Sequence, residues 1–282
     1  MNGHAWIGAL AGFAFSALAQ AAPFAMITDL KGDAWASERG KQQKLALLSY
    51  IESPFEVKVE PSTTLGVTYF TSGVQYSFQG PARVALDAQT PRVIEGKPAQ
   101  PTKVGPEKAI AGGLSKDQWR RLQQATVVMR NVKSSFTVVS PDRNAVLTSE
   151  PEFEWTAAAD AKRYRLVVYA PDHRILYETT TEQTAMQPGS ALKLEAGQKY
   201  RWKVEALGVT QPVRAVGTFT IEDDALREKM IAGRPGVGAP LAGRIFFATI
   251  LEAEGYMTDA RAEWKVLARE YPDVPEIKQR GM

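Results

Sequence analysis

The sequence predicts a mainly β protein with three parts: a small β-domain, a β-sandwich and a C-terminal helical hairpin. Residues 24–90 alternate apolar and polar side chains in short runs, and turn signals at Ser72-Gly73 and Gly80-Pro81 separate these runs. Residues 136–221 contain seven further candidate strands at short intervals. After residue 244, apolar residues recur at helical spacing. The chain has 282 residues, which is long enough for more than one domain.

The composition limits the chemistry that the protein can perform. The sequence contains no cysteine, which excludes disulfides, thiolate catalysis, zinc–cysteine sites and iron–sulfur clusters. Its two histidines are His4 and His173. Because a single imidazole would remain after loss of the N-terminal segment, general-base and metal chemistry are strongly limited. We therefore expect no catalytic, cofactor-binding or metal-binding residues.

The first 21 residues have the pattern of a secretory signal peptide. No charged residue occurs from Trp6 to Ala19, and this run is short for a membrane span. Ala19-Gln20-Ala21 fits the small-x-small rule for cleavage, so the mature chain would begin near Ala22. The alternative is an uncleaved anchor, because the segment before Trp6 has no Lys or Arg. We expect a periplasmic protein without a transmembrane span in its mature part.

Residues 22–90 form the predicted N-terminal β-domain. The stretch VTYFTSGVQYSFQGPARVAL has the spacing of a hairpin across Ser72-Gly73, followed by a tight corner at Gly80-Pro81. Together with the preceding GDAWASERGKQQKLALL, it resembles a FecR-type extracytoplasmic domain over about residues 26–90. The resemblance implies a small β-fold and an exported location. The signalling role of that family's namesake is not implied, because nothing in the chain matches its cytoplasmic and transmembrane portions.

Residues 91–134 are predicted as a proline- and glycine-rich basic linker that ends in a connecting helix. Ser115 and Gln118 have the spacing of a capping box, which marks the start of the helix. An apolar stripe begins at Trp119 and continues to Met129. Such a stripe is typical of a helix that docks onto a neighbouring domain.

The positive charge of the chain is concentrated in one segment. The formal net charge is +3, and residues 83–133 carry ten basic and four acidic side chains, while the other segments are nearly balanced. A basic block of this kind can bind an anionic surface such as an acidic polysaccharide. The alternative is a solvated linker and a charged helix face.

Residues 135–222 are predicted to form an immunoglobulin-like sandwich. Trp155 would fill its core, and Leu194, Gly197 and Tyr200 have the spacing of a tyrosine corner. The stretches SPDRNAVLTSEPEFEW and LEAGQKYRWKVEALG resemble a fibronectin type III domain, which implies a spacer or binding module. The candidate strands are 136–139, 145–148, 152–156, 163–169, 174–180, 191–194 with 199–206, and 213–221.

Residues 223–243 are predicted as a second linker, and residues 244–282 as a helical hairpin with a turn at Gly255 and a stop at Pro272. The hairpin resembles one tetratricopeptide unit, and a single unit cannot bury its own apolar face. That face either packs on the sandwich or receives a helix of a partner. The candidate partner-binding residues are Phe246, Trp264 and Trp119.

Three glutamates and one histidine are the catalytic candidates of the sequence. Glu150, Glu152 and Glu154 alternate around Pro151, and on a strand they would share one solvent-facing side, about 7 Å apart. Paired carboxylates of glycosidases have similar spacing, but an open strand edge does not raise a carboxylate pKa as a general acid requires. His173 lies in a turn, where we expect it to be exposed.

These observations predict an exported, non-catalytic interaction or scaffold protein of the bacterial cell envelope that binds protein partners. The alternative is a protein that binds carbohydrate, such as an acidic polysaccharide or peptidoglycan, through exposed aromatic residues such as Tyr69 or Tyr76 and through the basic stretch 83–133. Export and the modest net charge argue against a nucleic-acid partner. The motif Gly236-x-Gly238 does not follow a strand and lacks Gly-Lys-Ser/Thr, so it does not indicate a phosphate loop.

Overall fold

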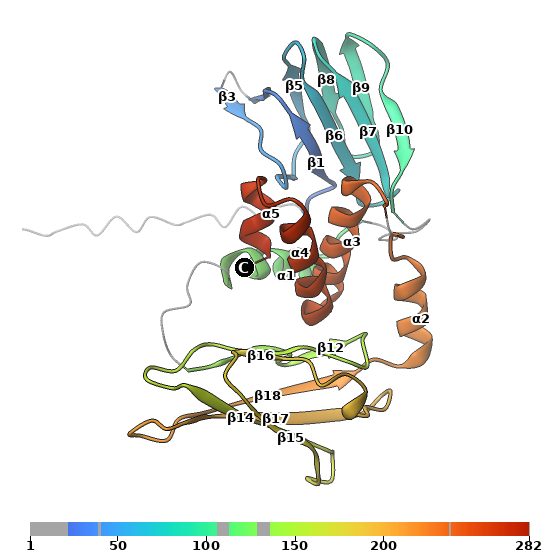
Figure 1. Ribbon diagram of the computed structural model, residues 1–282. Helices are drawn as coiled ribbons and strands as arrows, with labels where there is room; N and C mark the ends of the chain where they lie inside the picture. Colours follow the sequence, from blue (N-terminus) through green and yellow to red (C-terminus); the bar gives the residue numbers. More distant parts are fainter. Residues whose placement is uncertain (1–21, 39–40, 106–112, 129–135, 237, 282) are drawn as a thin grey trace, which may run out of the picture.

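The computed structural model describes residues 22–38, 41–105, 113–128, 136–236 and 238–281. It contains an N-terminal β unit, a β-sandwich and a group of helices that lies between them (Figure 1). The protein is mainly β with a C-terminal helical region, as predicted. The predicted signal peptide, residues 1–21, lies outside the described residues, as does Met129.

The N-terminal unit consists of two five-stranded antiparallel sheets with a common apolar core. One sheet has the order β10-β7-β6-β1-β4 and the other β3-β2-β5-β8-β9. The predicted hairpin joins β6 to β7 across residues 70–73, and β8 follows the corner at residues 80–81. The strands are β1 Ala25–Lys31, β2 Ala34–Glu38, β3 Lys41–Lys44, β4 Tyr50–Ile51, β5 Phe55–Val59, β6 Thr64–Tyr69, β7 Val74–Gln79, β8 Ala82–Leu86, β9 Pro91–Glu95 and β10 Gln100–Lys103.

The structure corrects the predicted start of the linker. Residues 91–103 are part of the N-terminal unit, because they form β9 and β10 at the edges of its two sheets. Pro91 pairs with Leu86 and Pro101 pairs with Tyr76. Proline is tolerated at an edge because its missing N–H faces away from the ladder. The prolines that suggested a linker therefore mark edge strands.

The sandwich comprises a three-stranded sheet, β11-β13-β16, and a five-stranded sheet, β12-β18-β17-β14-β15. In its core, Trp202 donates a hydrogen bond to the Pro141 carbonyl at 2.7 Å, and the Tyr200 hydroxyl accepts one from the Glu195 N–H at 2.8 Å. The tyrosine-corner prediction is thus confirmed, whereas predicted strand 191–194 contains no strand. The strands are β11 Val138–Ser140, β12 Asn144–Val146, β13 Phe153–Trp155, β14 Arg163–Tyr169, β15 Ile175–Thr181, β16 Ala185–Met186, β17 Lys199–Leu207 and β18 Arg214–Ile221; a 3₁₀ turn occupies Gly189–Ala191.

The helices are α1 Lys116–Val128, α2 Asp224–Ala232, α3 Leu241–Glu254, α4 Met257–Glu270 and α5 Pro275–Arg280. The capping box at the start of α1 is confirmed, since the Gln118 side chain accepts from the Ser115 N–H at 2.7 Å and the Ser115 hydroxyl accepts from the Gln118 N–H at 3.2 Å. Gly255 ends α3 with a left-handed φ of 95°. Helix α2 lies in the segment predicted as a linker, and α5 extends the predicted hairpin beyond Pro272.

The helical group is assembled from two distant parts of the chain. Helix α1 packs on α3, and α3 packs in turn on β1 and β6 of the N-terminal unit. A shared apolar cluster contains Met26 and Phe70 from that unit, Leu122 from α1, and Phe246 and Trp264 from the C-terminal helices. On the opposite side, Leu147 of the sandwich joins a smaller cluster with α3 and α4. The helices therefore contact both β units (Figure 1).

Candidate functional site

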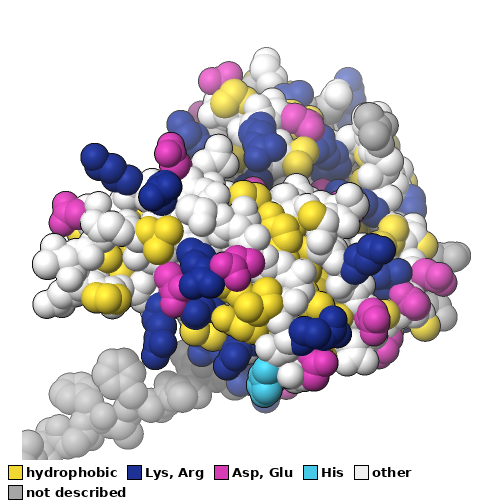
Figure 2. All heavy atoms as spheres, turned by 60° about the horizontal axis from the view of Figure 1, so that its bottom comes forward, with side chains coloured by type: hydrophobic (Ala, Val, Ile, Leu, Met, Phe, Trp, Pro, Cys, Tyr) yellow, Lys and Arg dark blue, Asp and Glu magenta, His cyan; other side chains and the backbone are white. Residues whose placement is uncertain are grey.

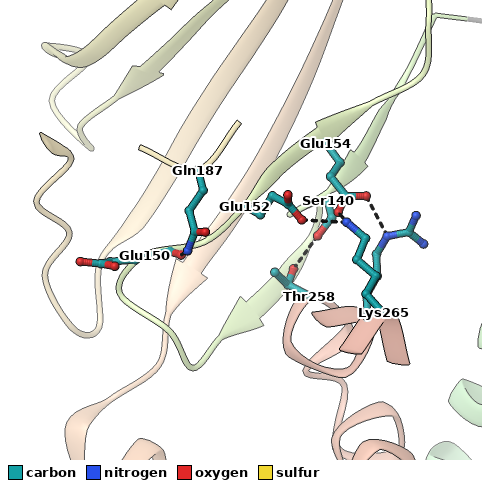
Figure 3. Close-up of polar contacts among 8 residues, drawn as sticks. Ser140, Glu150, Glu152, Glu154, Gln187, Thr258 and Lys265 are labelled. Atoms are coloured by element: carbon teal, nitrogen blue, oxygen red, sulfur yellow. Dashed lines mark hydrogen bonds and ion pairs between the residues drawn. The ribbon is translucent and has the colours of Figure 1, made fainter. Parts of the chain in front are cut away.

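A hollow lies where α4 meets the sandwich. It is a cavity of about 310 Å³. The sandwich wall carries Glu150, Glu152 and Glu154, and the α4 wall carries Arg261 and Lys265. Figure 3 shows the carboxylates of Glu152 and Glu154 pointing toward Lys265, whereas the Glu150 carboxylate points away from the helix. This groove is the candidate site that the structure adds to the sequence analysis.

The groove forms because two periodicities match. Alternate residues of an extended strand repeat every ~6.8 Å, and every fourth residue of a helix repeats every ~6 Å. Glu152 and Glu154 therefore come into register with Arg261 and Lys265, which are four residues apart on one face of α4. The Arg261 Nε donates to Glu154 at 2.9 Å, and the Lys265 Nζ donates to Glu152 at 2.7 Å and also to Glu154. These pairs hold α4 against the outer side of β13.

The first turn of α4 adds polar contacts to the same junction. The Thr258 hydroxyl accepts from the Ser140 hydroxyl at 3.1 Å (Figure 3). The Asp259 carboxylate accepts from the backbone N–H groups of Leu147 at 2.9 Å and Thr148 at 3.2 Å. Burial raises the pKa of Asp259 to about 6 despite these two hydrogen bonds. The helix is thus attached to both the side chains and the backbone of the sandwich.

The pairing of strand glutamates with helix cations does not continue beyond Glu152 and Lys265. Glu150 and Arg269 continue the two series, but both are exposed, and no ion pair joins them in the part of the chain that the structure describes. The Glu150 carbonyl instead accepts a hydrogen bond from Gln187 at 3.0 Å. The groove is open at this end. Its inner carboxylates are bound to Arg261 and Lys265, and these contacts fasten α4 to the sandwich.

The structure corrects the predicted solvent exposure of Glu152 and Glu154, whereas Glu150 is exposed as predicted. Glu154 is only 8% exposed, because α4 covers that side of the sheet. The partner, Lys265, lies 111 residues further along the chain, so no local pattern could reveal the pairing. His173 is exposed in the turn between β14 and β15, as predicted.

The candidate partner-binding residues form no open surface. Phe246, Trp264 and Trp119 are all buried in the cluster that joins the helices to the N-terminal unit. The hairpin face is covered by the protein's own α1 and β1 rather than left for a partner. This corrects the assignment of a partner-binding role to these residues. It also corrects the predicted packing on the sandwich, because these side chains pack on α1 and on the N-terminal unit.

Two features that suggested carbohydrate binding are also different in the structure. Tyr69 is buried, and Tyr76 packs against it edge to face with ring centroids 5.5 Å apart. In the described part of segment 83–133, Arg83 pairs with Glu56 and Glu95, and Arg121 donates to the Ala253 carbonyl. Tyr69 therefore offers no stacking platform, and Arg83 and Arg121 are engaged in contacts within the protein.

A buried ion pair stabilises the helical group. Glu252 on α3 accepts two hydrogen bonds from Arg280 on α5, both at 2.9 Å, and one from the Trp264 indole at 2.9 Å. Arg280 also lies over the Trp264 ring, 5.4 Å from its centroid, and donates to the Tyr50 hydroxyl of the N-terminal unit at 3.3 Å. Burial raises the pKa of Glu252, and Arg280 opposes that rise. The last helix is thereby tied to α3 and to the N-terminal β unit.

Two further findings concern the described residues. Among them, no group of three or more histidine, aspartate or glutamate side chains is placed to hold a metal ion. No helix within the same residues combines the length and apolar character needed to cross a bilayer.

Comparison with known proteins identifies no family. No protein-family model matches the chain, and no curated protein matches it. Among solved structures, the chain has a weak likeness to the crystal structure of a β-1,2-glucanase from Parabacteroides distasonis, with 10% sequence identity and a TM-score of 0.24. The likeness covers 87% of this chain and 48% of that structure, so the chain spans about half its length. A similarity at this level carries no argument about fold or function, and the FecR-like, fibronectin-like and tetratricopeptide-like resemblances stay predictions.

Proposed function

We propose that this chain is a non-catalytic interaction protein of the bacterial cell envelope, in which a helical group holds two β units at fixed positions for binding protein partners. The observation that carries the proposal is the junction between α4 and the sandwich, where Glu152 and Glu154 are consumed in contacts with Arg261 and Lys265. A catalytic cleft keeps its reactive groups available to substrate. This groove instead commits them to holding the parts together.

Contacts on the other side of the helices support the same interpretation. An apolar cluster joins the helices to the N-terminal unit, and the Glu252–Arg280 pair reaches Tyr50 on β4. Interfaces inside a chain allow domain motion unless they are substantial and apolar. Here both junctions combine apolar and ionic contacts, which favours a fixed spacing between the two β units.

The proposal is tested with a variant that should loosen the junction between α4 and the sandwich without unfolding the sandwich. Glu154→Lys places a third cation against Arg261 and Lys265, and it should detach the sandwich from α4 while leaving the sandwich core intact. Glu182→Lys makes the same charge change at an exposed position of the sandwich and serves as the control. Small-angle scattering should show a broader distribution of dimensions for the first variant than for the second.

Function is then assayed by cross-linking the tagged protein in bacterial envelope fractions. A partner that is recovered with the wild type and the control, lost with Glu154→Lys, and bound again when purified would support the proposal. Recovery of no protein partner would contradict it. Sedimentation with peptidoglycan in the absence of a protein partner would favour the carbohydrate-binding alternative.

A further inference from the structure

The sandwich has two outer faces, and they differ in charge and in cover. On the side of the three-stranded sheet, Glu152 and Glu154 face Arg261 and Lys265 of α4, as described above. No helix of the described residues covers the outer face of the five-stranded sheet (Figure 1). We name this surface the basic sheet face. Its members are Arg163, Arg165 and Tyr169 of β14, Ile175 and Glu178 of β15, Lys199, Arg201, Lys203 and Glu205 of β17, and Arg214, Val216, Thr218 and Thr220 of β18.

Strand alternation produces this face from a segment without net positive charge. Residues 134–222 contain ten basic and eleven acidic side chains. Along β14, β17 and β18, however, alternate residues enter the core, and the remaining ones point outward. The outward set includes six basic and two acidic side chains. Figure 2, turned toward this part of the molecule, shows basic side chains beside hydrophobic ones.

Both acidic members of the face are already paired. Glu178 binds Arg165 at 2.8 Å, and Glu205 binds Lys203 at 2.9 Å and Arg165 at 3.5 Å. Among the basic members of the basic sheet face, Arg163, Lys199, Arg201 and Arg214 have no carboxylate partner within the described ranges. An excess of about four positive charges is therefore available on one side of the sandwich.

Apolar side chains lie among these cations. Val216 is 49% exposed and Ile175 is 50% exposed. In the register of β17 and β18, Arg214 pairs with Glu205, which is four residues along β17 from Arg201. The two arginines are therefore about 14 Å apart. Val216 pairs with Lys203 and so lies between the levels of the two arginines along the strands. Protein interfaces combine apolar contacts with charged groups that steer the partner. A purely ionic ligand would leave Val216 and Ile175 without a contact.

The aromatic member of the face argues against a sugar ligand. The Arg201 guanidinium lies over the Tyr169 ring, 5.0 Å from its centroid. That face of the ring is occupied by a cation–π contact and is not free to stack on a sugar. On the covered side of the sandwich the charges are reversed, since the acidic Glu154 binds Arg261 and Lys265 of a protein helix.

We infer that the basic sheet face binds an acidic polypeptide segment of a partner protein, with its carboxylates on Arg201 and Arg214 and its apolar side chains on Val216 and Ile175. This inference rests on the proposed function, because it specifies the partner surface of the same interaction protein. It assigns the binding to the sheet face rather than to the buried aromatic residues of the helices.

The test uses the full chain and a fluorescent 12-residue peptide that alternates glutamate and valine. Arg201→Glu/Arg214→Glu should weaken peptide binding about tenfold or more in fluorescence anisotropy, and raising the salt from about 50 to 300 mM should weaken wild-type binding. Lys229→Glu/Lys278→Glu makes the same change in net charge at exposed positions of α2 and α5, and its affinity should stay near that of the wild type. Thermal unfolding verifies that all the variants fold.

Three results would overturn the inference: no peptide binding, equal loss in both double variants, or stronger face-dependent binding of alginate or of phosphatidylglycerol vesicles than of the peptide. The partner recovered from envelope fractions distinguishes this failure from failure of the proposed function. If Arg201→Glu/Arg214→Glu still binds that partner and Glu154→Lys does not, the interaction role stands and the basic sheet face is excluded as the surface.

Discussion

Replacement of Arg280 by methionine should strongly destabilise the protein. Arg280 is buried and makes both of its short ionic contacts, at 2.9 Å, to Glu252. Methionine keeps an unbranched apolar side chain near the Trp264 ring but removes the charge. Glu252 would then be a buried carboxylate with the Trp264 indole as its remaining hydrogen-bond donor.

The magnitude follows from the geometry of the pair. Charges about 4 Å apart attract by about 4 kcal/mol at an effective dielectric constant of about 20. Removal of one member of a buried pair costs about 3–5 kcal/mol, since the other charge is left desolvated. We therefore expect the free energy of unfolding of Arg280→Met to fall by about 3–5 kcal/mol near neutral pH.

The loss should also depend on pH with a defined sign. Burial already raises the pKa of Glu252, and loss of Arg280 removes the cation that opposes the rise. A carboxyl whose pKa is higher in the folded than in the unfolded protein stabilises the fold at low pH, and this contribution is lost as the pH rises through the folded-state pKa. The difference between wild type and Arg280→Met should accordingly widen from pH 5 to pH 8.

Urea denaturation, with unfolding followed by tryptophan fluorescence, measures these free energies. The control is Glu252→Gln/Arg280→Met, which removes both charges and keeps an acceptor for the Trp264 indole. We expect this double variant to be more stable than Arg280→Met by about 2 kcal/mol at pH 8. If the two variants are equally unstable at every pH, the lost packing of Arg280, and not a stranded charge, explains the effect.

Three other substitutions test the sandwich and its junction. Tyr200→Phe removes the acceptor of the Glu195 N–H and should lower the free energy of unfolding by about 1–2 kcal/mol. Gly217→Ala would put a Cβ 2.4 Å from the Trp202 indole nitrogen, so the ring must move, at a cost of about 2–4 kcal/mol. For Asp259, a folded-state pKa of about 6 means that its carboxyl stabilises the fold below pH ~4 and that this contribution is lost by pH ~7. As the pH rises from about 4 to about 7, the free energy of unfolding of Asp259→Asn should increase by about 2 kcal/mol relative to that of the wild type. Urea denaturation measures this difference.

Each of these expectations has a contrary result. A Tyr200→Phe protein as stable as the wild type would show that the hydroxyl contributes nothing at the corner. An unchanged tryptophan emission in Gly217→Ala would show that the Trp202 ring does not need to move. A constant stability difference between Asp259→Asn and the wild type from pH 4 to pH 7 would show that this carboxyl has the same pKa in the folded and unfolded states.

Features held by neighbouring residues could be predicted from the sequence. The capping box links Ser115 to Gln118, and the tyrosine corner links Glu195 to Tyr200, so each partner lies within a few residues of the other. Local spacing alone can specify such contacts. The same holds for the strand alternation that places Trp202 in the core.

Features that depend on distant residues could not be predicted. No local signal shows that Glu154 meets Lys265, and without that contact Glu154 reads as a solvent-facing residue. The basic sheet face was missed for a different reason. Summing charges over a segment adds both faces of every strand, so the outward excess is cancelled by acidic groups elsewhere in the sandwich. Charge has to be counted by face, which requires the register of the strands.

The arrangement of the helices also determines which experiments are informative. Deletion of residues 240–282 would remove α3, α4 and α5, and the most direct reading of any lost binding would be that the tail binds the partner. In the structure, those helices cover Leu122 of α1 and Met26 and Phe70 of the N-terminal unit. The truncated chain would expose these side chains to water, at a cost of about 1.5–3 kcal/mol for each large one, and would present an artificial apolar surface. Truncation therefore perturbs the fold and the binding surface together, whereas charge reversal on the basic sheet face changes only a surface that is already exposed.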